Sequence, residues 1–119
     1  MVHKQKIALV ANTTWNISNF RKNILKALHE AGFELIVIAP VDEYIDYLTE
    51  FPYVKHVPVK HLSRKGINPL QDLLLIAELI HLYRKQKVDL ALHYTIKPNL
   101  YGSFAARYLG LDNISVITG

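Results

Sequence analysis

The sequence predicts an α/β fold, a three-layer, doubly wound parallel sheet of about five strands, and two patterns in the chain lead to it. Short apolar runs alternate with segments whose apolar residues recur at helical spacing. Residues 6–11 and 34–39 are nearly continuous aliphatic runs, which is typical of buried strands in a parallel sheet. A helical segment joins them, so the two strands form a βαβ unit with a right-handed crossover.

The segment between these two strands predicts one helix. Its apolar residues follow one another at spacings of three or four, which places them on one helical face. Asn16 or Ser18 can cap the amino end, and Gly32 stands where a left-handed carboxyl cap belongs. The apolar positions are Ile17, Phe20, Ile24, Leu28 and Ala31.

The middle of the chain predicts a short helix, an edge strand and a basic loop. Residues 42–51 form the helix, with acidic residues in the first turn, where the helix dipole favours them. Residues 53–59 alternate between apolar and polar and form the strand. Pro58 cannot donate to a ladder there, which indicates a position near the sheet edge, with His56 facing solvent. Residues 60–67 form the loop.

Residues 69–87 predict a long helix with apolar residues on two sides. Asn68 can cap it, Pro69 suits its first position, and Gln71 is placed for a capping box. Because there are two apolar stripes, we expect the helix to be covered on two sides. One stripe comprises Leu70, Leu73, Leu74, Ala77, Ile80 and Tyr83, and the other comprises Leu75, Leu79 and Leu82.

A strand, a helix and a last strand complete the order βαβαβαβαβ. Residues 88–93 predict the fourth strand, a helix opened by Pro98 follows, and Gly110 caps that helix. Residues 114–117 predict the fifth strand. For a doubly wound sheet of this kind, the expected strand order is 3-2-1-4-5.

The length and composition are those of one globular domain. The chain has 119 residues, of which half are hydrophobic and a fifth charged, and it carries a net charge of +4 with no cysteine. Disulfides and thiolate metal sites are therefore excluded. Residues 1–6 lack the pattern of a signal peptide, and no apolar run is long enough to span a bilayer, so we expect a cytoplasmic protein. The sequence stops just after a strand, which we interpret as a fragment of a larger protein.

In a sheet of this type, ligands bind outside the carboxyl ends of the strands. The turn after the first strand, residues 12–16, has no glycine, so neither a dinucleotide fingerprint nor a phosphate loop is present there. No His, Asp and Glu residues have metal-ligand spacing, and no nucleophile triad can be argued. The candidate binding residues at this edge are Asn12, Thr13, Trp15, Arg64, Lys65, His93 and Lys97.

Each candidate also has an ordinary structural interpretation. Trp15 can stack on a sugar or a base, or plug the helix start. His93 can serve as a base or hydrogen-bond a hydroxyl, or it can be a satisfied histidine at a strand end. Lys97 can meet a phosphate or be solvated. Arg64 and Lys65 form a basic neighbourhood that can bind anionic head groups or simply face water.

Three stretches together resemble the N-terminal half of bacterial glycosyltransferase family 4 enzymes, which have the GT-B fold. The first runs from Lys6-Ile-Ala-Leu-Val-Ala-Asn to Ser18-Asn-Phe-Arg. The second is Lys60-His-Leu-Ser-Arg-Lys-Gly-Ile-Asn-Pro. The third begins at Asp89-Leu-Ala-Leu-His-Tyr-Thr-Ile-Lys-Pro-Asn and continues to Gly119. The likeness is greatest to transferases of capsular polysaccharide, O-antigen and glycan-lipid assembly.

This resemblance implies one half of a two-domain enzyme that retains anomeric configuration without a protein-bound metal. The N-terminal Rossmann-like domain would hold the acceptor, often a polyprenyl-diphosphate sugar at the inner face of the plasma membrane. A C-terminal domain, absent from this sequence, would hold the nucleotide-sugar donor, and no cofactor is expected in residues 1–119. Many relatives have a glycine pair where this chain has Asn12-Thr13-Thr14, and a histidine where it has Thr118-Gly119, so no catalytic residue is assigned.

Other functions remain open from sequence alone. One alternative is a non-catalytic Rossmann-like module that binds a small anionic ligand. A nucleic-acid partner is not expected, because the chain shows no concentrated basic stripe with interleaved aromatic residues.

Overall fold

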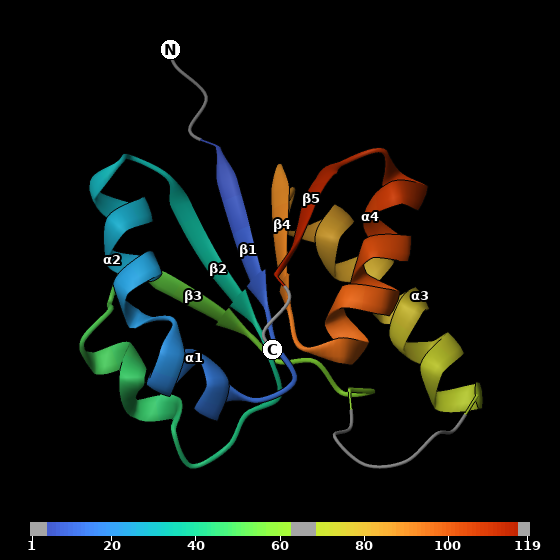
Figure 1. The fold of residues 1–119 in the computed structure, drawn as a ribbon, viewed down its shortest axis with the longest axis horizontal. Coiled ribbons are helices and arrows are strands. Elements are labelled where there is room, and N and C mark those ends of the chain that lie inside the picture. Colours follow the sequence, from blue (N-terminus) through green and yellow to red (C-terminus); the bar gives the residue numbers. More distant parts are fainter. Residues whose placement is uncertain (1–4, 63–68, 117–119) are drawn as a thin grey trace.

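A five-stranded parallel sheet in the order β3-β2-β1-β4-β5 forms the centre of the fold (Figure 1). The computed structural model describes residues 5–62 and 69–116. Every described strand pair is parallel, and the predicted fold class and strand order are confirmed. The strands are β1 (Lys6–Val10), β2 (Glu34–Ile38), β3 (Val54–Val57), β4 (Leu90–Tyr94) and β5 (Asp112–Val116).

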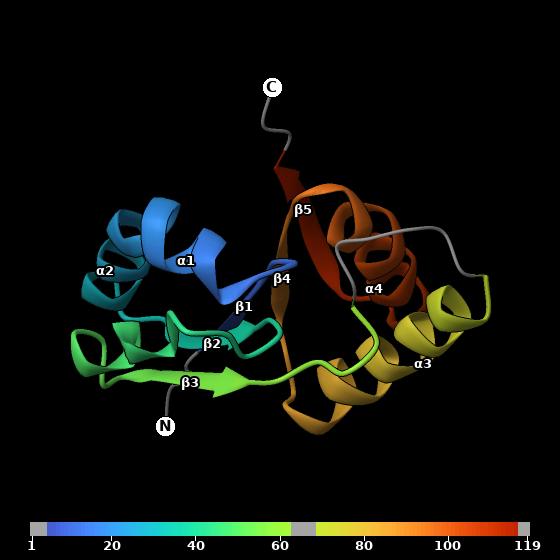
Figure 2. The same ribbon diagram turned by 90° about the horizontal axis from the view of Figure 1, so that it is seen from below.

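Helices cover both faces of the sheet (Figure 2). One face carries α1 (Thr14–Phe20), α2 (Lys22–Glu30) and the 3₁₀ helix η1 (Ile45–Thr49). The other carries α3 (Pro69–Lys85), the π-helical turn η2 (Pro98–Gly102) and α4 (Ser103–Leu109).

The alternation of side chains along β1 divides the core into two halves. Ala8 and Val10 pack with α3 and α4, whereas Ile7 and Leu9 pack with α1, α2 and η1. All four side chains are buried, because a central parallel strand has helices on both sides. This arrangement explains the unbroken aliphatic run of the sequence.

The helix predicted between β1 and β2 is in fact two helices. The chain breaks at Arg21, whose backbone has φ −117° and ψ 5°. The Arg21 guanidinium lies 4.0 Å from the ring centroid of Tyr94, and its Nε donates to Asn16 Oδ1 at 3.3 Å. These tertiary contacts fix the side chain at the break.

The predicted amino-terminal cap of the first helix was wrong, and the predicted carboxyl cap is confirmed. Thr13, rather than Asn16 or Ser18, caps α1, since its Oγ1 accepts the Asn16 N–H at 3.0 Å. Gly32 has φ +95°, a left-handed conformation that glycine adopts without steric cost.

The prediction that α3 is covered on two sides was wrong for its first half. Leu70 and Leu73 are about two-thirds exposed, at 67% and 66%, and Leu74 is also exposed. The buried side is Asp72, Leu75, Leu79 and Tyr83, a spacing of three and four that faces the sheet. The predicted Asn68 cap lies outside the described residues.

The interpretation of His56 as solvent-facing was also wrong. β3 does lie at the sheet edge, but the His56 ring is half-buried. Its Nδ1 lies 2.8 Å from the Tyr47 hydroxyl, and its Nε2 lies 3.0 Å from the Ala39 carbonyl oxygen. Burial lowers the pKa of His56. The ring therefore attaches η1 to the end of β2.

Candidate functional site

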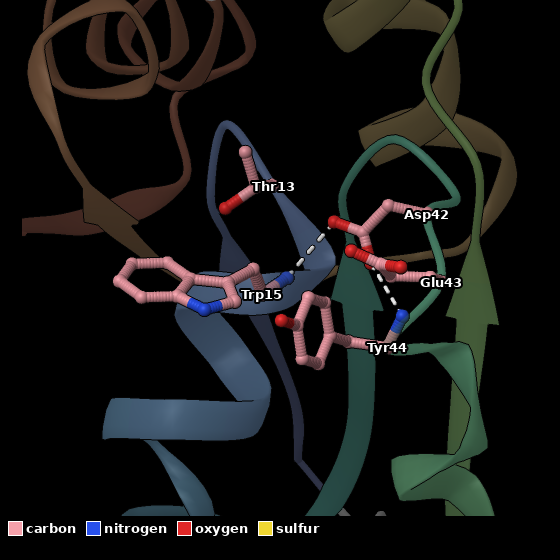
Figure 3. Close-up of a pocket in the computed structure, with 5 residues that line it drawn as sticks. All are labelled: Thr13, Trp15, Asp42, Glu43 and Tyr44. Carbon is pink, nitrogen blue, oxygen red and sulfur yellow. Dashed lines mark hydrogen bonds between the residues drawn. The ribbon is translucent and has the colours of Figure 1, made fainter.

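A pocket of about 420 Å³ opens at the carboxyl ends of β1 and β2 (Figure 3). This is the edge where doubly wound sheets bind ligands. Two of its residues follow β1 and three follow β2 along the chain. The lining residues are Thr13, Trp15, Asp42, Glu43 and Tyr44.

Asp42 holds the two turns of this pocket together. Its Oδ2 accepts the backbone N–H of Trp15 at 3.0 Å, and its Oδ1 accepts the backbone N–H of Tyr44 at 2.8 Å. Thr14 adds a second link, since its Oγ1 donates to the Pro40 carbonyl at 2.5 Å. These two hydrogen bonds join the turn after β1 to the turn after β2, across sequence separations of 26 and 27 residues.

Two aromatic rings are available in the pocket. Trp15 is 40% exposed and Tyr44 is 38% exposed. The Trp15 indole is supported by an edge-to-face contact with Phe20, with 5.2 Å between ring centroids. An exposed ring held by a neighbour offers an apolar platform with little conformational freedom to lose.

The sequence prediction found part of this pocket. Thr13 and Trp15 line it, and Asn12 lies next to them in the same turn but is not a lining residue. The topology also places residues 40–43, after the second strand, at this edge, but Asp42 and Glu43 were not chosen as candidates because the acids there were assigned to the first turn of a helix. Tyr44 was missed, and its position next to these residues was the signal that could have identified it.

Lys97 lies apart from this pocket, among residues of α3 and η2. Its Nζ is 3.5 Å from Asp72 Oδ1, and Tyr101 donates its hydroxyl to Asp72 Oδ2 at 2.9 Å. The buried Asp72 carboxylate partly offsets the charge of Lys97 and holds the lysine side chain in place. Asp72 and Tyr101 were not anticipated from the sequence.

His93 is fully buried on the α3 side of the sheet. Its Nε2 lies 2.8 Å from the Tyr83 hydroxyl, and burial lowers its pKa to about 4. The ring is therefore neutral near pH 7 and packs under the Gly102 backbone. The structure brings Thr13 and Trp15 together, but it places neither His93 nor Lys97 in their pocket.

The basic loop after β3 is anchored where the structure describes it. Glu78 of α3 accepts the backbone N–H groups of Lys60 and His61 at 2.8 and 3.0 Å, and it also pairs with His61 Nδ1 at 3.0 Å. The predicted candidates Arg64 and Lys65 lie outside the described residues.

Within residues 5–62 and 69–116, no group of three or more His, Asp and Glu side chains is placed to hold a metal ion. Over the same ranges, no helix is both long and apolar enough to cross a membrane.

A parallel sheet in this order, with a pocket at its carboxyl edge, defines a domain of the Rossmann-like α/β class. The family described as Glycosyl transferase 4-like matches residues 6–118, nearly the whole chain. The chain therefore belongs to this glycosyltransferase family. The resemblance seen in the sequence is confirmed at the level of the family.

A curated relative is the N,N'-diacetylbacillosaminyl-diphospho-undecaprenol alpha-1,3-N-acetylgalactosaminyltransferase of Campylobacter jejuni. It is 29% identical over 103 residues, which is 87% of this chain and 27% of the relative. The chain thus spans about a quarter of the length of the curated relative it matches.

Solved structures share the fold at low sequence identity. A glycosyltransferase from Rickettsia africae superposes with a TM-score of 0.77 at 15% identity, covering 98% of this chain and 30% of that protein. The UDP-GlcNAc 2-epimerase of Methanocaldococcus jannaschii superposes with a TM-score of 0.69 at 17% identity, covering 97% and 32%. Since transferases and epimerases share this fold, these likenesses bear on architecture and not on reaction type.

Proposed function

We propose that this chain is the acceptor-binding domain of a retaining glycosyltransferase that extends a lipid-linked glycan in cell-surface polysaccharide synthesis. The sugar would come from a nucleotide-sugar donor held by a C-terminal domain, and residues 1–119 alone would bind acceptor without catalysing transfer. Transfer needs donor and acceptor oriented in one cleft, which one half cannot provide.

The observation that carries this proposal is the family match over residues 6–118, combined with a pocket at the ligand-binding edge. The Campylobacter jejuni relative, by its name, acts on a diphospho-undecaprenol-linked sugar, which supports a polyprenyl-diphosphate-sugar acceptor. The alternative of a non-catalytic anion-binding module is not favoured, because the matched family is one of transferases.

Acceptor binding should be measurable on the chain itself. We expect a short-chain prenyl-diphosphate N-acetylhexosamine to bind at least about tenfold more tightly than UDP-N-acetylglucosamine in calorimetry. Lys97→Met should weaken binding of the prenyl-diphosphate sugar by about tenfold, because one charge-assisted contact is lost. Lys26→Met is the matched control, because it removes the same charge from an exposed position on α2. Tighter binding of the nucleotide sugar would contradict the proposal and indicate a donor-side role.

We also propose peripheral contact with an anionic membrane surface through the outer side of α3, η2 and α4. Leu70, Leu73, Leu100 and Phe104 are all at least 59% exposed, and α3 is joined to η2 by the Asp72–Tyr101 hydrogen bond. The three elements pack against one another, and exposed apolar side chains gathered on neighbouring elements are typical of an interaction surface. A membrane fits, because a prenyl-linked acceptor is embedded in one.

Vesicle sedimentation checks this proposal. The chain should bind vesicles of mixed phosphatidylglycerol and phosphatidylcholine more than vesicles of phosphatidylcholine alone. Replacing Leu70 and Leu73 with serine should lower binding on the order of a hundredfold, since two leucines leave the apolar phase and each contributes about 1.5 kcal/mol or more. Ile114→Ser, at an exposed residue of β5, should leave binding unchanged. If the unmodified chain, the double serine variant and Ile114→Ser all sediment equally with vesicles, α3 does not contact the membrane.

A further inference from the structure

We propose that the pocket lined by Thr13, Trp15, Asp42, Glu43 and Tyr44 selects its sugar by charge. It accepts a neutral or amine-bearing sugar ring of the acceptor and rejects a sugar that carries a carboxylate. The inference rests on the proposed function for the identity of the ligand as a sugar. The charge preference follows from the groups that line the pocket.

The aromatic residues supply the surface on which a sugar ring can lie. Trp15 comes from the turn after β1 and Tyr44 from the turn after β2, and both rings are more than a third exposed. Figure 3 shows the two side chains projecting from neighbouring turns beside the two carboxylates. The negative face of an aromatic ring attracts the C–H groups of a pyranose, whatever substituents the ring carries. Stacking therefore gives affinity without fixing charge preference.

The carboxylates supply the charge preference. Asp42 is held in place because both of its oxygens accept backbone N–H groups. Glu43 is exposed beside it, and neither a hydrogen bond nor an ion pair to the described residues occupies its carboxylate. Carboxylate oxygens accept hydrogen bonds from sugar hydroxyls and attract an ammonium group, whereas they repel another carboxylate.

Among the residues that the structure describes, the lining of the pocket holds no positive charge to offset these carboxylates. Thr13, Trp15, Asp42, Glu43 and Tyr44 include no Lys, Arg or His, although the chain carries a net charge of +4. An acidic pocket on a basic chain discriminates by repulsion as well as by attraction. The diphosphate of a lipid-linked acceptor must then lie outside this pocket, toward cations such as Lys97.

The test uses three sugars with the same pyranose ring: methyl glucoside, methyl glucuronide, which has a carboxylate at C6, and methyl 2-amino-2-deoxyglucoside, which has an ammonium group at C2. Trp15 is the single tryptophan of the chain, so its fluorescence and its indole N–H resonance report on this pocket directly. At low salt we expect the glucoside to bind on the order of tenfold more tightly than the glucuronide, and the amino sugar at least as tightly as the glucoside. Glu43→Gln should reduce the ratio of glucoside affinity to glucuronide affinity by half or more on a logarithmic scale, because one of the two carboxylates that repel the glucuronide is gone.

Glu30→Gln is the matched control, because it removes the same charge from an exposed position on α2 and should leave the preference intact. Equal affinities for the glucoside and the glucuronide would overturn the charge selection and leave the proposed function standing. A glucuronide preference would overturn it as well. If none of the three sugars changes the fluorescence or the indole N–H resonance of Trp15, the pocket does not bind a sugar and the proposal is overturned. The prenyl-diphosphate binding experiment tests the proposed function separately.

Discussion

Replacing Gly102 with alanine should destabilise the fold by about 3 kcal/mol, because the added methyl group overlaps buried atoms. Gly102 has an ordinary helical backbone, so its role is close approach and not a special φ. A Cβ built there would lie 2.5 Å from His93 Nε2 and 3.0 Å from the Tyr83 hydroxyl. Both neighbours are fully buried and bonded to each other, so neither can move without breaking that hydrogen bond.

Urea denaturation measures this effect against a control glycine. Gly110→Ala adds the same methyl group where no atom lies within 4 Å, but its φ of +72° should cost about 1 kcal/mol. Combining Gly102→Ala with His93→Asn should cost less than the sum of the two single changes, because the smaller side chain leaves room. A Gly102→Ala protein as stable as Gly110→Ala would show that the π-helical turn relaxes readily.

The sheet could be predicted from sequence because each strand carries its own evidence. Residues of β1 and β2 are buried on both faces, so their aliphatic runs indicate buried parallel strands, and the doubly wound topology then supplies the strand order. The break between α1 and α2 could not be predicted, because the Arg21 side chain is held by Tyr94, 73 residues further on. Local periodicity contains no trace of that contact.

The prediction of which sides of α3 are covered failed for a different physical reason. Apolar residues occupy two sides of this helix, so periodicity alone cannot decide which side meets the sheet. Tertiary contacts decide which side faces inward. Tyr83 hydrogen-bonds to His93, and Asp72 accepts a hydrogen bond from Tyr101 and pairs with Lys97. A buried aspartate on the inner side is the opposite of what a hydrophobic pattern predicts.

The candidate site shows how far strand order alone can lead. It was enough to choose the turn containing Thr13 and Trp15, since the carboxyl ends of β1 and its neighbours form the ligand edge. It was not enough to distinguish residues that face the pocket from those that face the core. His93 is the next-to-last residue of β4 at this edge, yet its side chain is 0% exposed. Which way a strand-end side chain points depends on register and on the helix that covers it.

Stability should fall as the pH drops from about 6.5 to about 4, and His93 should account for about 3 kcal/mol of that loss. Burial lowers the pKa of His93 from 6.5 to about 4. Above 6.5 the ring is neutral in both states, and its contribution is complete. Between the two values the unfolded chain takes up a proton that the folded chain does not, so the free energy of unfolding decreases as the pH falls.

The surroundings of His93 explain why a charged ring is not accommodated. Burial raises the pKa of Tyr83, so its hydroxyl stays protonated and supplies no counter-charge, and His93 Nδ1 has no hydrogen-bond partner among the described residues. His93→Asn should therefore show a shallower decline in urea stability between pH 6.5 and 4, although the lowered pKa of His56 leaves part of the slope in place. His81→Asn, at an exposed position of α3, should retain the full slope. If His93→Asn declines as steeply as the unmodified chain, the acid sensitivity arises from His56 or from carboxylates, and a proton on His93 costs the folded state little.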